Sequence, residues 1–300
     1  MNKLLLIFLL IAVEAVAQDD LLKMLQSETP SHDEKVIATF KGDKIVNIET
    51  NETVRKNNLD IRISHLFGNV GAESGGGIHN FYGLDQSADI RIALHYGITD
   101  RLMVGLGRAK RNENFEGLAK YRLLQQTTDM RIPIAVTLFG NTTYSIREYD
   151  QDVSNVNRFT YCSQLVIARK FSSKFSFAVV PSYIHRNYVP ADDENNTFSL
   201  SGGMRMKFTR STSIIADYSH TFGRENLTQD VYDAIGIGFE IETGGHVFSL
   251  YASNASGCLA NDYLVNTVDT WGKGGMKLGF IISRMLRFSK VEEPVRTPDK

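Results

Sequence analysis

The chain has 300 residues, a formal net charge of −1 and 42% hydrophobic residues, and it contains only two cysteines. A charge this close to zero, without a basic stripe, excludes a typical nucleic-acid-binding protein. Cys162 and Cys258 stand alone, so they make neither a disulfide framework nor the close spacing of a zinc site. We therefore expect no metal and no cofactor.

The first residues have the pattern of a cleavable signal peptide. Lys3 precedes an apolar run over residues 4–13, and Ala15-Val16-Ala17 has the small-x-small pattern of a signal-peptidase site. The run is too short to cross a bilayer, where about 20 residues are needed. We therefore expect residues 1–17 to be a signal peptide and the mature chain to start at Gln18.

Residues 18–58 form the next expected segment, an N-terminal extension. Within it, residues 19–25 look like a short amphipathic helix and residues 26–34 like a linker containing proline. A β-prone stretch follows over residues 35–47, and residues 48–58 are polar. Two positions for this extension stay open: the periplasm and the lumen of a barrel.

Residues 59–288 repeat a unit of about ten residues that alternate apolar with polar or small side chains, followed by a turn. This repeat predicts an all-β fold, a single antiparallel transmembrane β-barrel that hides its backbone polar groups from lipid by closing the sheet. Twelve strands are expected, over residues 59–67, 88–98, 101–110, 114–124, 131–144, 158–170, 174–186, 197–208, 211–222, 231–242, 246–254 and 274–288. Residues 289–300 would form a polar C-terminal tail.

The connections between these strands alternate in length. Thr99-Asp100 and Gly244-Gly245 are short turns, whereas residues 68–87 and 255–273 are long loops. Outer-membrane barrels have short periplasmic turns and long extracellular loops, so we expect the cell outer membrane as the location, with both termini periplasmic. A secreted soluble β-sandwich is the alternative that composition leaves open, but it has no reason to sort its loops in this way.

Successive strand residues point to opposite faces, which separates a lipid-facing from a lumen-facing set. One face is apolar, with aromatic residues near strand ends: Tyr96, Tyr121, Tyr183, Phe208 and Phe222. The other face carries the charged residues Asp60, Arg62, Asp89, Arg91, Glu116, Lys120, Arg122, Arg158, Arg205, Lys207, Asp217, Glu240 and Lys277. Eight are basic and five acidic. They form either a self-neutralising network in a plugged barrel or the wall of a narrow pore for small anionic solutes.

Three stretches resemble a known family: 63–68 (ISHLFG), 80–105 (from NFYGLD to YGITDRLMVG) and 279–284 (GFIISR). They are similar to an uncharacterised family of outer-membrane β-barrels from Bacteroidota, a domain of unknown function. The resemblance extends over roughly residues 35–288 and implies the fold and the location but no reaction. Such a barrel would contact outer-membrane lipid and would depend on the barrel-assembly machinery during biogenesis.

A membrane-embedded hydrolase of the outer-membrane phospholipase type is the alternative function. Those enzymes are also twelve-stranded barrels and use a Ser-His-Asn constellation on the outer wall. The candidate segments here are residues 218–221 and 253–257. By parity His220 faces outward and Ser219 and Ser253 inward, so they do not form the nucleophile-base pair that acyl transfer needs. We therefore expect no catalytic residues and a non-enzymatic role, as a plugged structural barrel or a narrow passive pore.

Overall fold

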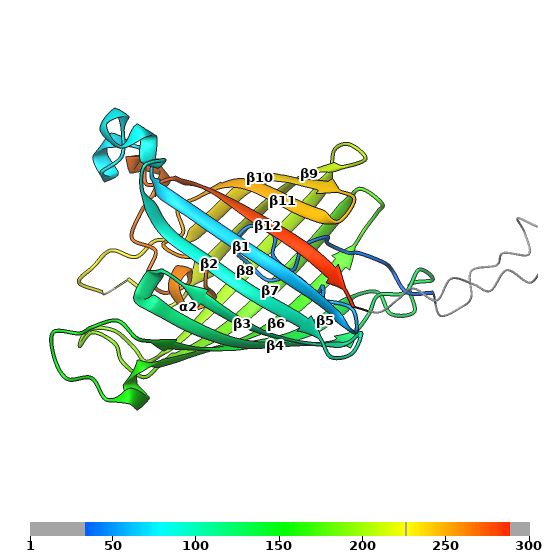
Figure 1. Ribbon diagram of the computed structural model, residues 1–300, viewed down its shortest axis with the longest axis horizontal. Helices are drawn as coiled ribbons and strands as arrows, with labels where there is room; N and C mark the ends of the chain where they lie inside the picture. Colours follow the sequence, from blue (N-terminus) through cyan, green and yellow to red (C-terminus); the bar gives the residue numbers. More distant parts are fainter. Residues whose placement is uncertain (1–33, 226, 289–300) are drawn as a thin grey trace, which may run out of the picture.

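The computed structural model describes residues 34–225 and 227–288, and it contains twelve strands that close into an antiparallel barrel (Figure 1). The strands are β1 (Asn58–Asn69), β2 (Ser87–Gly97), β3 (Leu102–Ala109), β4 (Asn114–Leu124), β5 (Ala135–Ser145), β6 (Phe159–Lys170), β7 (Phe175–Arg186), β8 (Asn196–Lys207), β9 (Thr212–Thr221), β10 (Ala234–Thr243), β11 (His246–Ser253) and β12 (Lys277–Arg287). Each strand pairs with its neighbours in sequence, and β1 pairs with β12, where Ile63 lies opposite Ile282. This closure leaves no open sheet edge.

The all-β fold and the twelve strands expected from the sequence are confirmed. The largest differences are at three strand starts, one of which is β10, which begins at Ala234 rather than at residue 231. β5 begins at Ala135 rather than at residue 131, because Pro133 has no N–H to donate to a neighbouring strand. β12 begins at Lys277 rather than at residue 274, because Gly274 turns the chain with a φ of 72°. The expected signal peptide, the helix at 19–25 and the tail after residue 288 lie outside the described residues.

The two ends of the barrel differ in the length of their connections. At the end that we call the turn end, the connections cover residues 98–101, 125–134, 171–174, 208–211 and 244–245. At the opposite end, the loop end, they cover residues 70–86, 110–113, 146–158, 187–195, 222–233 and 254–276. The long loops extend to the left in Figure 1. No helix in the described ranges has the length and apolar character to cross a membrane.

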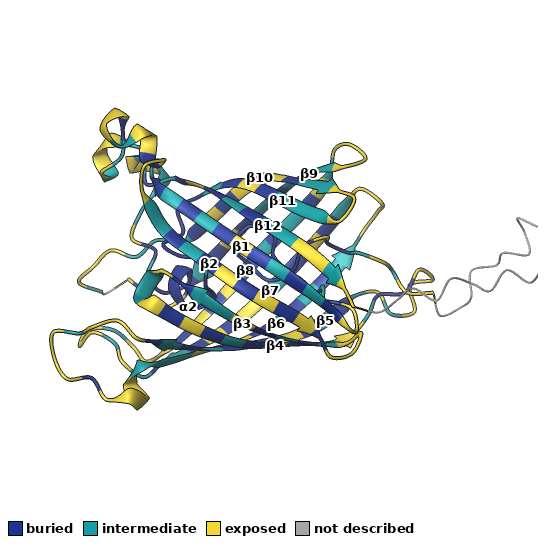
Figure 2. Cartoon of the chain, viewed as in Figure 1, coloured by how far each residue is buried: buried dark blue, intermediate teal, exposed yellow. Residues whose placement is uncertain are grey.

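The barrel wall alternates between exposed and buried residues along each strand (Figure 2). On β8, for example, Leu200 is 45% exposed on the outer face, whereas its neighbour Ser201 is 2% exposed. The exposed positions are mainly large and apolar, which suits contact with lipid. The inward positions are mainly polar, yet they are buried because other parts of the chain fill the lumen. Much of the lumen is therefore occupied by the chain itself.

The outward position of Leu200, near the middle of β8, predicts a depth-dependent cost for charge. Leu200→Arg should lower the free energy of unfolding by about 2 to 4 kcal/mol, because the guanidinium would lie in hydrocarbon. The matched variant Phe208→Arg, in the turn after β8, should cost about 0 to 1 kcal/mol because it lies near the interface. Urea unfolding in lipid vesicles measures both. Equal costs would contradict the placement of the wall in the membrane.

Candidate functional site

A hairpin from the N-terminal extension occupies the lumen. We call residues 39–54 the plug hairpin. Its two arms are joined by an antiparallel bridge between Lys44 and Glu49, and the turn between them contains Val46 and Asn47. The backbone N–H of Ile45 donates to the carbonyl of Ile48 over 3.0 Å. The apolar side chains near the tip, Ile45, Val46 and Ile48, are at most 2% exposed and belong to the main core cluster with wall residues.

The tip of the plug hairpin is held by one carboxylate, that of Asp217 on β9. The backbone N–H groups of Val46, Asn47 and Ile48 all donate to Asp217 Oδ2, over 3.0, 2.6 and 3.1 Å. The Asn47 side-chain amide donates to Asp217 Oδ1 over 2.8 Å. Convergent N–H groups of a turn form a concave anion site, and hydrogen bonds to an ionised acceptor are stronger than neutral ones. Asp217 thus supplies acceptors for the N–H groups that the turn leaves unpaired.

Two glycines make room for the tip on either side of Asp217. In the sheet register, Gly203 on β8 and Gly236 on β10 are both opposite Asp217. A Cβ on Gly203 would lie 2.6 Å from Ile48 Cδ1, and a Cβ on Gly236 would lie 2.5 Å from Val46 Cγ1. A larger residue at either position would therefore collide with the native side chain that it faces in the plug hairpin, Ile48 or Val46. We call Gly203, Asp217 and Gly236 the socket.

The arms of the plug hairpin carry acidic residues that pair with basic residues of the wall. Glu49 lies 2.8 Å from Lys120 Nζ, and Lys120 is fully buried. Asp43 pairs with Arg62 and lies 2.8 Å from His95 Nδ1. These contacts join the hairpin to β1, β2 and β4, opposite the socket on β8 to β10. Breaking a buried ion pair by removing one partner is strongly destabilising, so these contacts hold the hairpin from a second side.

A second segment enters the lumen from the loop end. We call residues 254–267, between β11 and β12, the inward loop; it contains the short helix α2 (Ala260–Tyr263). Leu259, Tyr263 and Leu264 are at most 2% exposed. The length of this loop predicts a position outside the barrel, but its first half folds back because Tyr263 and Leu264 are buried against wall residues such as Ile184. The hairpin and the loop meet where Lys44 Nζ donates to the carbonyl of Cys258 over 2.7 Å.

Most of the predicted lumen-facing charges lie buried inside this arrangement. The buried ones are Asp60, Arg62, Asp89, Arg91, Glu116, Lys120, Arg205, Asp217, Glu240 and Lys277, whereas Arg122, Arg158 and Lys207 are half-buried. Arg91 pairs with Glu116 and Arg205 with Glu240, each over 2.6 Å. Arg158 ends a 3₁₀ turn before β6 rather than lying on the strand. The described part of the chain holds no group of three His, Cys, Asp or Glu residues that could bind a metal.

Sequence reasoning missed the acidic residues of the plug hairpin, Asp43 and Glu49, because it left the position of the extension open. Glu52 is a third, 3.6 Å from Arg122. These carboxylates reduce the basic excess that the wall alone carries. A usable signal was the run of residues 43–49 (DKIVNIE), in which apolar residues flank an asparagine suited to a turn.

The residues considered for hydrolysis are separated by the wall. His220 lies on the outer face, with Nδ1 2.9 Å from Asp233 Oδ2. Ser219 is buried and accepts a hydrogen bond from the Ser201 hydroxyl over 2.8 Å, and the Ser253 hydroxyl accepts one from the Asn47 amide over 3.2 Å. Both serines therefore have partners on the lumen side. This geometry gives no nucleophile-base pair between them and His220.

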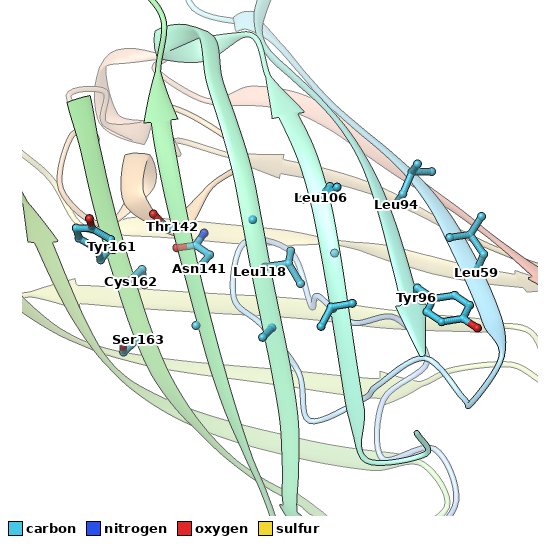
Figure 3. Close-up of a pocket in the computed structure, with 15 residues that line it drawn as sticks. Leu59, Leu94, Tyr96, Leu106, Leu118, Asn141, Thr142, Tyr161, Cys162 and Ser163 are labelled. Atoms are coloured by element: carbon cyan, nitrogen blue, oxygen red, sulfur yellow. The ribbon is translucent and has the colours of Figure 1, made fainter. Parts of the chain in front are cut away.

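The outer wall has a shallow apolar depression of about 800 Å³ across β1 to β6 (Figure 3). Small outward residues form its floor, namely Gly117, Ala119, Gly140 and Ser163, and larger ones such as Tyr96, Leu106 and Tyr161 surround them. None of the lining residues is charged. The depression therefore belongs to the lipid-facing surface.

The contact between Asp217 and the hairpin tip predicts the effect of Asp217→Asn. An amide keeps the volume but loses the charge and one acceptor, so residues 45–48 should exchange their amide hydrogens at least about tenfold faster while the barrel stays folded. Hydrogen exchange read by mass spectrometry checks this. Asp233→Asn, on the outer wall, is the control and should leave the hairpin unchanged. Unchanged exchange in Asp217→Asn would contradict the assigned contact.

Comparison with known proteins gives one family match and several distant structural ones. Residues 40–286 match a family described as a membrane-bound β-barrel domain (DUF5777). No curated protein matches the sequence. Among solved structures, the chain is similar to the NanC porin, with 9% identity over 76% of this chain and 98% of that chain and a TM-score of 0.48.

Two further solved structures cover the barrel to a similar extent. The KdgM porin shows 10% identity over 77% of this chain and 99% of that chain, with a TM-score of 0.43. An outer membrane channel from Pseudomonas putida F1 shows 15% identity over 79% of this chain and 98% of that chain, with a TM-score of 0.47. Similarity this distant does not establish a shared function. Because the family match spans most of the sequence and agrees with the closed barrel, the chain belongs to the family of membrane-bound β-barrel domains DUF5777.

Proposed function

We propose that this protein is a non-enzymatic outer-membrane barrel that its own plug hairpin closes. The observation that carries the proposal is the socket, in which Asp217 accepts three backbone hydrogen bonds from the hairpin tip between two glycines. Eight-stranded barrels are filled by their side chains, whereas barrels of 16 or more strands leave an aqueous channel. Twelve strands lie between these sizes. A lumen of this width needs an added segment to be closed, and the hairpin with the inward loop supplies it.

The outer membrane as the location follows from the sorting of the connections. Four of the five connections at the turn end have two to four residues and the fifth has ten, whereas five of the six at the loop end have nine or more. In outer-membrane barrels the short turns face the periplasm, so we place the turn end there, together with both chain termini. Outer-membrane lipid around the apolar wall and the assembly machinery of that membrane are the partners that this placement implies.

A narrow passive pore is the second candidate, and a specific observation favours it. Two cavities lie on either side of the contact between plug hairpin and inward loop, one of about 520 Å³ at the turn end and one of about 590 Å³ at the loop end. Only noncovalent contacts hold the hairpin between them. If the hairpin moved away, Lys120 and Arg122 would lose their acidic partners Glu49 and Glu52 and would line the passage, which would favour small anionic solutes.

The placement of the turn end predicts which surface is reachable from outside the cell. A Cβ added to Gly75, in the loop between β1 and β2, or to Gly244, in the turn between β10 and β11, would meet no atom within 4 Å. An epitope inserted after Gly75 should bind antibody on intact cells, and one inserted after Gly244 should bind only after the outer membrane is permeabilised. The reverse pattern of labelling would overturn the orientation.

The role of the hairpin predicts how conductance changes when it is removed. The native protein in planar bilayers should show little or no conductance, and a variant lacking residues 39–54 should conduct, with a reversal potential in a salt gradient that favours anions. In the same deletion, Lys120→Gln with Arg122→Gln should reduce this preference, because the unpaired cations would be gone. Leu200→Val, a single change of the wall in the otherwise native protein, is the control and should show no more conductance than the native protein.

Two results would contradict this account. Conductance of the native protein equal to that of the deletion variant would show that the hairpin does not close the lumen. A folded deletion variant that stays silent would reject the pore and leave a structural barrel.

A further inference from the structure

The cavity at the loop end differs from the rest of the lumen in the residues that line it. It measures about 590 Å³ and lies between the loop of residues 146–158, the loop of residues 187–195 and the inward loop. These segments form the left end of the barrel in Figure 1, with α2 inside it. A volume of this size is typical of small-molecule sites. On the proposed orientation it opens to the outside of the cell.

One wall of this cavity combines arginines with tyrosines. The guanidinium groups of Arg147 and Arg158 lie 4.6 and 5.0 Å from the centre of the Tyr149 ring. Tyr188 meets Tyr149 edge to face at 5.5 Å. In the part of the chain that the structure describes, neither arginine forms an ion pair, and their hydrogen-bond partners are neutral. Arg158 donates to the carbonyls of Ser145 and Arg147. Arg147 donates to the Asn112 amide oxygen. Both positive charges therefore remain available to an anion.

Arg186, which also lines the cavity, does form an ion pair. It pairs with Asp193 over 2.8 Å, and Arg224 pairs with the same carboxylate over 2.5 Å. Burial raises the pKa of Asp193, but the two guanidinium groups outweigh this effect and hold that pKa below its usual value. Asp193 therefore neutralises Arg186 and ties two loops together. The contrast sets Arg147 and Arg158 apart as charges that the fold leaves unpaired.

The floor of the cavity is formed by α2 and holds unpaired polar atoms. Asn261 is 4% exposed, lines the cavity, and has no hydrogen-bond partner at either its Nδ2 or its Oδ1 atom. Asp262 is 1% exposed and its Oδ2 atom is equally unpaired, whereas Oδ1 accepts a hydrogen bond from the Asn112 amide over 2.7 Å. Burial raises the pKa of Asp262 to about 7, so this carboxyl can also donate a proton in a hydrogen bond. Buried polar groups normally have hydrogen-bond partners, so these atoms of Asn261 and Asp262 offer donors and acceptors to a molecule in the cavity.

We propose that this cavity binds a small anionic saccharide. Its carboxylate or sulfate group would lie between Arg147 and Arg158, which can form charge-assisted hydrogen bonds to it. The apolar face of the sugar ring would pack on Tyr188, which is exposed, whereas the two guanidinium groups already cover the Tyr149 ring. Hydroxyl groups would satisfy the donor and acceptor atoms of Asn261 and Asp262. The site does not depend on whether the barrel conducts.

The test compares two probes that differ only in charge. Cellobiouronic acid and cellobiose have the same two rings, but only the acid carries a carboxylate. Isothermal titration of the purified full-length protein should show the acid binding at least about tenfold more tightly, since a charge-assisted hydrogen bond contributes about that factor. The binding of the acid should weaken as salt rises.

Variants assign the binding to these residues. Arg147→Gln with Arg158→Gln should abolish the preference for the acid. Asn261→Ala should weaken the binding of both probes. Arg210→Gln, at the opposite turn end, is the matched control and should bind like the native protein. The proposal would be overturned by equal affinity of the native protein for the two probes. It would also be overturned if Arg210→Gln lost the preference for the acid as fully as the double variant, or if inorganic sulfate bound as tightly as cellobiouronic acid. A barrel that binds the acid but never conducts would still support it.

Discussion

The contact between the Asp217 carboxylate and the turn of the plug hairpin determines the state of the whole lumen. A tight turn exposes consecutive backbone N–H groups that its own strands cannot satisfy, and burying them without a partner is costly. Asp217 satisfies three of them with one oxygen atom. The carboxylate in turn needs such donors, because the lumen around it is closed to water by the hairpin that it binds. Each group therefore makes the burial of the other favourable.

The remaining charges of the lumen are arranged around that contact. The plug hairpin brings Asp43 and Glu49 to the basic side of the barrel, where Lys120 would otherwise be buried without an acidic partner and Arg62 would have Asp60 alone. Away from the hairpin, Arg91 with Glu116 and Arg205 with Glu240 pair along the wall itself. The wall and the hairpin are thus complementary in charge as well as in shape. This complementarity explains how a hairpin with several ionisable groups can be buried in the lumen.

The sequence predicted the barrel well because a transmembrane strand has a simple period. Alternation and turn residues located all twelve strands, and parity placed residues such as Lys120 and Asp217 on the inner face. The plug hairpin could not be placed in this way. Its anchor lies 170 residues away from Asn47 in sequence, and Asp217 looks like any other inward carboxylate until the sheet register is known. Only the register places Gly203 and Gly236 beside it. The inward loop was misplaced because its length was read without regard to its apolar residues, such as Leu259 and Leu264.

Cross-linking in intact membranes tests most directly whether the plug hairpin occupies the socket. A Cβ at position 236 would lie 2.5 Å from Val46 Cγ1, so the double variant V46C/G236C should form a disulfide under oxidising conditions. The cross-linked peptides should be recovered by mass spectrometry without reductant and separate after reduction. The pair V46C/G244C, which joins the tip to the turn end, should not cross-link. A folded V46C/G236C barrel that forms no disulfide, or that forms no more than the V46C/G244C pair, would contradict the hairpin-closed lumen.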